Sequence, residues 1–188
     1  MPAKIILLES LTNYTTNFLK TLNENVIVKN SFDSVVNRGG RMKMPQDIYD
    51  LDRFIKVQER TYDTALEEVS QGMKRSHWMW WIFPQVTGLG MTMTSQMYSI
   101  KSIEEARAFF AHPYLGRNLR EISYRLLTLA SNDAYEVFGS PDDLKLRSSM
   151  TLFAEAAPDE EVFGKVLDKF YGGKKDERTI AILKELEK

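Results

Sequence analysis

The sequence of 188 residues has no cysteine and only two histidines. The absence of cysteine excludes disulfides, a thiol nucleophile and any metal site built on thiolates. Two histidines are too few for a histidine-rich metal site. We therefore expect a protein without a bound metal. No sequence feature indicates a cofactor either, and none is expected.

The sequence also lacks an excess of charge and a long apolar run. Lys and Arg total 25 against 26 Asp and Glu, a net charge of -1, so no overall field attracts the chain to nucleic acid or to anionic lipid. The first apolar run, residues 5–8, ends at an acid and is too short for a signal sequence or a membrane span. We expect a soluble cytoplasmic protein that binds neither nucleic acid nor membrane.

Apolar residues recur at three- and four-residue steps through most of the chain, whereas alternating strand patterns are almost absent. This periodicity predicts an all-α fold, a compact multihelical single domain of about seven or eight helices. Hydroxyl or carboxyl caps are expected at Asp47, Ser76, Ser102, Ser140 and Asp176. The predicted helices cover residues 47–69, 76–84, 102–112, 113–129, 140–153, 158–170 and 177–188.

A cluster of helix-breaking residues interrupts the chain near residue 40. Gly39 and Gly40 are followed closely by Pro45. Before this cluster, apolar residues at positions 8, 11, 18 and 22 follow a helical spacing. The sequence therefore predicts an N-terminal helical appendage over residues 1–45 and a main domain over residues 46–188.

Residues 74–85 hold all three tryptophans and one of the two histidines. A helix starting at Ser76, with Lys74 and Arg75 just before it, could hold a phosphate or a carboxylate. His77 could act as a general acid or base, and Trp78 could stack on a planar ligand. The predicted site comprises His77 as a catalytic residue and Lys74, Arg75, Ser76, Trp78 and Gln85 as ligand-binding residues.

The same segment has a purely structural interpretation. Aromatic clusters usually build protein cores, and Trp78 and Trp81 would lie on one side of a helix. In that case His77 would bond to a carbonyl, and the two cations would be solvated.

Two further positions are candidate ligand-binding residues. His112 precedes Pro113 at a predicted helix junction, where it could line a site or simply cap carbonyls. Ser148 lies with Ser149 in the middle of an unusually polar helix, which suggests close packing or the wall of a polar pocket. The glycine-rich stretch 169–176 lacks the spacing of a phosphate-binding loop and is interpreted as a turn between helices.

Several of these motifs resemble, in order, the signature of the bacterial family DUF1810, a domain of unknown function. Members have sometimes been labelled calpastatin, but that inhibitor is a disordered repeat protein, unlike this chain. The resemblance implies a compact multihelical domain from about residue 50 to the C-terminus, and it implies no particular reaction. The motifs are Gly72-Met-Lys-Arg-Ser-His-Trp-Met-Trp80, Ile82-Phe-Pro-Gln85, Gly88-Leu-Gly90, His112-Pro113, Leu115-Gly116, Pro141-Asp-Asp143, Lys145-Leu-Arg-Ser-Ser-Met-Thr-Leu-Phe153 and Leu167-Asp-Lys-Phe170.

Two hypotheses about function follow from the residues. The first is a cleft of His, Trp, Lys and Arg side chains that binds, and could process, a phosphorylated or nucleotide-like small molecule. The alternative is a helical protein–protein interaction module whose aromatic groove takes a partner helix or peptide. Cations at the bottom of a concave pocket would favour the small-molecule hypothesis, and cations on a convex rim would favour the protein-partner hypothesis. The sequence determines neither a reaction nor an oligomeric state.

Overall fold

The computed structural model describes residues 48–186. Within this range the chain forms nine helices and one isolated parallel β-bridge, and no strand. The all-α prediction is therefore confirmed. The predicted N-terminal helix, the cap at Asp47 and the boundary at residues 45–46 lie outside the described residues and stay predictions.

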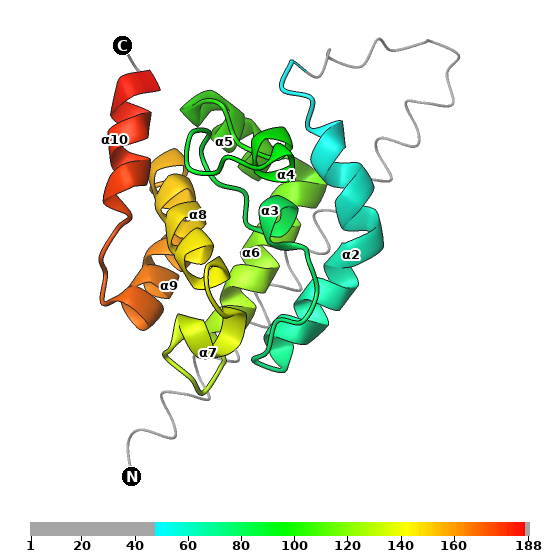
Figure 1. The fold of residues 1–188 in the computed structure, drawn as a ribbon, viewed down its shortest axis with the longest axis vertical. Coiled ribbons are helices and arrows are strands. Elements are labelled where there is room, and N and C mark those ends of the chain that lie inside the picture. The colour runs from blue at the N-terminus through cyan, green and yellow to red at the C-terminus, as the bar shows by residue number, and fades with distance from the viewer. Residues whose placement is uncertain (1–47, 187–188) are drawn as a thin grey trace. The chain divides into compact units, whose positions relative to one another are not determined.

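The helices pack in several layers around a shared apolar core (Figure 1). Helix α8 contacts α3, α5, α7, α9 and α10, while α2 packs against α3 and α6. The short helices α4 and α7 are additions to the predicted set. The helices are α2 (Asp52–Ser70), α3 (Met79–Ile82), α4 (Met93–Met97), α5 (Ile103–Ala111), α6 (Pro113–Leu127), α7 (Ala134–Phe138), α8 (Asp142–Ala156), α9 (Glu161–Tyr171) and α10 (Glu177–Leu186).

Helix α8 is buried on most sides, which explains its mixed sequence. Large apolar residues such as Met150 and Phe153 are completely buried in it, and so are the small polar residues Ser149 and Thr151. The Thr151 hydroxyl donates to the carbonyl of Arg147 at 2.8 Å, so its burial leaves no unsatisfied donor. Small side chains on α8 allow neighbouring helices to approach closely.

The junction between α5 and α6 depends on His112 and on Gly116. His112 Nδ1 accepts hydrogen bonds from the amides of Tyr114 (3.2 Å) and Leu115 (3.4 Å), so it caps the start of α6 rather than the carbonyls at the end of α5. A Cβ atom on Gly116 would lie 1.8 Å from the carbonyl oxygen of Phe110. Only glycine fits where the two helices meet this closely.

Four of the predicted helix N-caps lie within the described residues, and two of these four are confirmed. Ser102 accepts a hydrogen bond from the amide of Glu105 at 3.1 Å, and Asp176 accepts one from the amide of Thr179 at 3.0 Å. Both acceptors are three residues before their donors, as in a typical N-cap.

The predicted caps at Ser76 and Ser140 are wrong. Trp78 occupies the N-cap position of α3 and Pro141 that of α8, neither with a side-chain cap. At α8 the carbonyl of Gly139 accepts the Asp143 amide at 3.0 Å, which is the donor that a Ser140 cap would need. Ser76 instead donates its hydroxyl to the carboxylate of Glu68, on α2.

Candidate functional site: a cationic cleft beside α8

The segment that leads into α3 is held by the carboxylate of Glu68, on α2. Its Oε2 accepts hydrogen bonds from the amides of Arg75 (2.7 Å) and Ser76 (3.1 Å) and from the Trp78 indole (2.8 Å). Its Oε1 accepts from the Ser76 hydroxyl at 2.5 Å. Burial acts to raise the pKa of Glu68, but these hydrogen bonds outweigh it and lower the pKa to about 2. Glu68 is therefore a buried, ionised anchor.

This anchor accounts for much of the tryptophan-rich segment. The Ser76 donors and the Arg75 amide already bond to Glu68. Trp78 is 1% exposed and packs near Phe83 and Phe138 in the core. The Arg75 guanidinium donates to the side chain of Gln71 at the surface. The structural interpretation therefore fits Trp78 and Arg75, and Trp81 is partly buried against the same core. It is wrong for Lys74, which is largely buried rather than solvated.

Lys74 belongs to a chain of charges that leads away from the anchor. Its ammonium is largely buried and lies 2.7 Å from Asp142 Oδ2. The other oxygen of Asp142 accepts from Lys145 Nζ, also at 2.7 Å. Burial acts to raise the pKa of Asp142, but the two lysines outweigh this effect and lower it. Lys145 Nζ in turn lies 4.5 Å from the centroid of the Trp80 ring, a cation–π contact.

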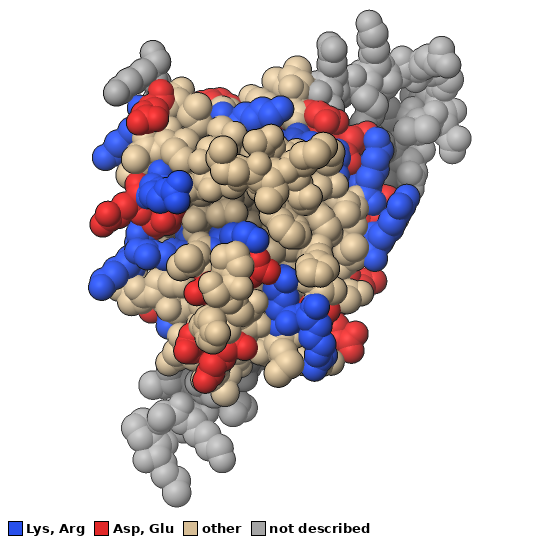
Figure 2. Space-filling model, viewed as in Figure 1, with Lys and Arg blue, Asp and Glu red and all other residues tan. Residues whose placement is uncertain are grey.

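Lys145 and Trp80 border a cleft of about 460 Å³. In Figure 2, blue Lys and Arg side chains lie along one side of a hollow near the centre of this face, and tan residues lie along the other. The bridge between Val86 and Ile100 holds the loop that forms one wall, since Ile100 N donates to Gln85 O at 2.8 Å. The lining residues are Trp80, Gln85, Leu89, Gly90, Met91, Thr92, Ser95, Pro141, Leu144, Lys145, Arg147, Ser148, Asp176 and Arg178.

The charged lining of the cleft comprises three cations and one carboxylate, namely Lys145, Arg147, Arg178 and Asp176. Arg147 donates from Nε to the carbonyl of Lys174 (2.9 Å) and from Nη2 to that of Lys175 (2.7 Å). Arg178 is exposed at the start of α10, and its guanidinium bonds to none of the described residues. The cleft thus carries an excess of positive charge that is only partly engaged within the protein.

Two of the predicted ligand-binding residues, Gln85 and Ser148, line the cleft together. Lys74 is not a lining residue, and it connects to the cleft only through Asp142 and Lys145. The remaining predicted residues, which are Arg75, Ser76, His77, Trp78 and His112, are not among the lining residues.

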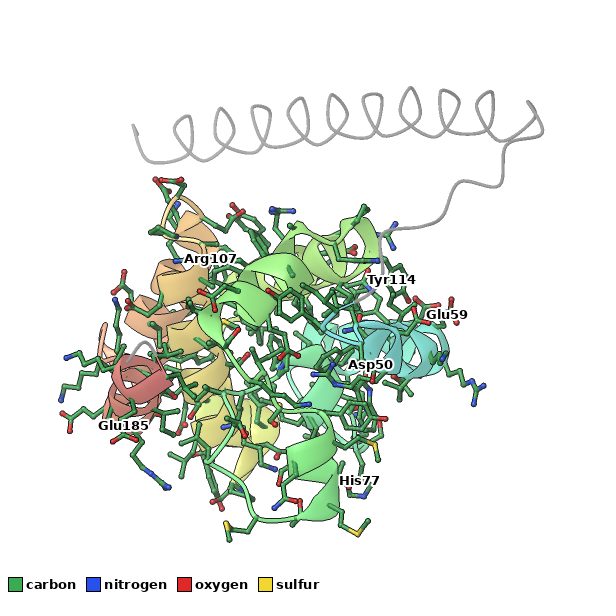
Figure 3. All side chains as sticks on the ribbon, turned by 90° about the horizontal axis from the view of Figure 1, so that it is seen from above. Asp50, Glu59, His77, Arg107, Tyr114 and Glu185 are labelled. Carbon is green, nitrogen blue, oxygen red and sulfur yellow. The ribbon has the colours of Figure 1, made fainter. Side chains whose placement is uncertain are left out.

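The two histidines are not brought together. His77 is exposed, and Figure 3 shows it beside α3, well apart from Tyr114, whose amide donates to His112. Within residues 48–186, no group of three or more His, Asp or Glu side chains could hold a metal ion. None of the helices in the same range is both long and apolar enough to cross a bilayer.

Trp80, Asp176 and Arg178 were not assigned to the site from the sequence, and Lys145 and Arg147 were included only within a family motif. The motif around Pro141 and Lys145 was a usable signal for one wall. Arg178 had none, because an arginine in the first turn of a helix is an ordinary surface residue.

Fold and site together define an all-helical domain with an open cationic cleft beside its central helix. The chain belongs to the family described as protein of unknown function (DUF1810), whose model matches residues 48–183. It is similar to the conserved hypothetical protein Rv1873 from Mycobacterium tuberculosis, with 45% sequence identity and a TM-score of 0.72. That match covers 73% of this chain and 99% of the crystal structure's chain. No curated protein matches this chain.

Proposed function

We propose that the cleft binds a small anionic molecule, phosphorylated or nucleotide-like. The observation that carries the proposal is the lining itself: three cations and one carboxylate around a hollow of about 460 Å³. This volume lies within the range of about 300–1,000 Å³ that is typical of small-molecule sites. Cations that converge on a concave surface suit phosphate or carboxylate groups.

The apolar part of the lining suits a ring or another flat group. Trp80 is half-buried, and Leu89, Pro141 and Leu144 add further apolar surface. Lys145 Nζ lies over the Trp80 ring, 4.5 Å from its centroid, so a ligand against the remaining surface of the ring could meet a positive charge and an aromatic group at once. A base or a sugar ring against Trp80, with its phosphate toward Arg178 and Lys145, would use both. The proposal is one of binding, and we assign no reaction.

The alternative of a protein partner is supported by the rim of the cleft. Of the lining residues, Met91 is 87% exposed and Leu144 57%, and Met93, two residues after Met91, is 82% exposed. Exposed methionines adapt to many apolar partners, as in promiscuous peptide-binding surfaces. The cations favour the ligand, because they line the hollow rather than a convex rim.

The test is a thermal-shift and calorimetric screen with nucleoside monophosphates, sugar phosphates and nicotinamide compounds. A ligand at 100 times its Kd should stabilise the protein by roughly 2.7 kcal/mol. Arg178→Ala should weaken binding of any hit without changing the melt of the free protein, since this guanidinium bonds to none of the described residues.

Arg60→Ala is the matched control, because Arg60 is an exposed arginine on α2, which contributes no residue to the cleft. It should leave both the affinity and the melt unchanged. No shift with any compound would overturn the ligand proposal and favour the interaction module. Equal losses of affinity in the Arg178 and Arg60 variants would place the site elsewhere.

A further inference from the structure

Asp176 is the one carboxylate among the charged residues that line the cleft, and the other three are cations. Its Oδ2 accepts three hydrogen bonds, from the Ser148 hydroxyl (3.1 Å), the Thr179 amide (3.0 Å) and the Thr179 hydroxyl (2.5 Å). Its Oδ1 accepts from none of the described residues, and it is not among their buried atoms that lack a partner. One oxygen is therefore committed to the protein, and the other, on a side chain that lines the cleft, has no partner among the described residues.

The position of this carboxylate is fixed from three directions. The Asp176 amide donates to the Thr151 hydroxyl at 2.9 Å, and Oδ2 caps α10. Arg147 holds the two preceding carbonyls, those of Lys174 and Lys175. A carboxylate held in this way keeps its free oxygen in one place, which is the usual requirement for selective hydrogen bonding to a ligand.

An ionised carboxylate only accepts hydrogen bonds, so it repels a phosphate and attracts a donor. A ligand that satisfies the whole lining therefore needs an anionic group for the cations and a hydroxyl or another donor for Asp176. Both occur within a few bonds of each other in a phosphorylated sugar.

We infer that Asp176 Oδ1 accepts a hydrogen bond from a sugar hydroxyl of the bound molecule, so that the ligand class is a ribonucleotide with free ribose hydroxyls. This inference rests on the proposed function. Asp176 is then a specificity-determining residue, and its N-cap bonds are what position it. If Asp176 were only a cap, Asp176→Asn would leave any preference for the sugar hydroxyls unchanged.

The probes are AMP and 2′,3′-dideoxyAMP, measured by calorimetry on the full chain. Wild-type protein should bind AMP at least about tenfold more tightly, because a hydrogen bond to a charged acceptor is lost with the hydroxyls. Asp176→Asn should lose most of this preference, because its amide nitrogen offers the hydroxyl only a weaker, neutral hydrogen bond. Asparagine caps helices as well as aspartate does, and its carbonyl can replace Oδ2 while its amide replaces the free acceptor with a donor.

Asp63→Asn is the matched control, since it makes the same change of charge at an exposed position on α2. It should keep the tenfold preference. Equal binding of the two nucleotides by the wild type would overturn the inference but leave the proposed function standing. If Asp176→Asn binds both nucleotides more tightly and keeps the preference for AMP, the Asp176 charge only repels the phosphate. That result would also overturn the inference.

Failure of the wild type to bind either nucleotide would overturn this inference, and the wider screen with Arg178→Ala would then decide the proposed function separately. If Asp176→Asn does not fold, equal binding of the two nucleotides by the wild type still overturns the inference.

Discussion

Replacing Glu68 by glutamine should destabilise the protein by an amount that depends on pH. The folded carboxyl has a pKa of about 2, against an ordinary value of 4.5. A depressed pKa contributes stability that is present above the unfolded value and lost as the pH falls through the folded value. Two and a half pKa units correspond to about 3 kcal/mol at pH 7, of which about 2 kcal/mol should be lost by pH 3.

Glutamine retains much of the neutral hydrogen bonding around Glu68. Its carbonyl can accept from the Arg75 and Ser76 amides and the Trp78 indole, and its amide can donate to the Ser76 hydroxyl. The lost part is the charge, so Glu68→Gln should cost about 2–3 kcal/mol at pH 7. Glu68→Ala should cost more, because it leaves buried donors without an acceptor.

The assay is urea unfolding followed by tryptophan fluorescence at pH 7, 5, 4 and 3. The difference in the free energy of unfolding between wild type and Glu68→Gln should shrink as the pH falls. Glu59→Gln is the control: Glu59 is exposed on the same helix (Figure 3), and its variant should follow the wild type at every pH. A difference for Glu68→Gln that stays constant from pH 7 to pH 3 would refute the reasoning.

Three further changes test the packing of the described domain by chemical denaturation. Gly116→Ala should lower the free energy of unfolding by about 3 kcal/mol or more, since the new Cβ would lie 1.8 Å from a backbone oxygen of α5. Gly164→Ala is the control: nothing lies within 4 Å of its Cβ, so it should be neutral or stabilise the protein by up to about 1 kcal/mol. Lys169→Met should lower the free energy of unfolding by about 2 kcal/mol, because the Lys169 ammonium donates to three carbonyls at the end of α6 and so caps that helix. Lys165→Met removes only an exposed ion pair and should stay close to wild type. Equal effects of the two variants would contradict the capping role of Lys169. Tyr62→Phe should cost about 1 kcal/mol through its buried hydroxyl, and no measurable change would contradict that bond's contribution.

The helical architecture could be predicted from the sequence because it rests on local patterns. Apolar residues at three- and four-residue steps bury one face of a helix wherever the partner lies. The caps at Ser102 and Asp176 were predictable for the same reason, since donor and acceptor are three residues apart. The caps at Ser76 and Ser140 were wrong because a tertiary acceptor and a competing carbonyl replaced the local geometry.

The candidate site could be predicted only in part. Gln85 and Ser148 both line the cleft, and the charge network from Lys74 reaches it. The carboxylate of Glu68, by contrast, gives no signal in the sequence, because a glutamate in an amphipathic helix is common at solvated positions. Glu68 acts as an anchor only because the folded chain places the Trp78 indole within hydrogen-bonding distance of its carboxylate.

The sequence by itself determined an all-α domain of a recognisable family and the segments that matter in it, because periodicity and motif order are properties of the chain alone. Only the tertiary structure decided which side chains of those segments meet. It buries Trp78, commits Ser76 to Glu68 and opens a cleft where Trp80, Lys145 and Arg178 converge. That convergence depends on how α3, α8 and α10 pack, and such packing joins residues far apart in the chain, so no local pattern contains it.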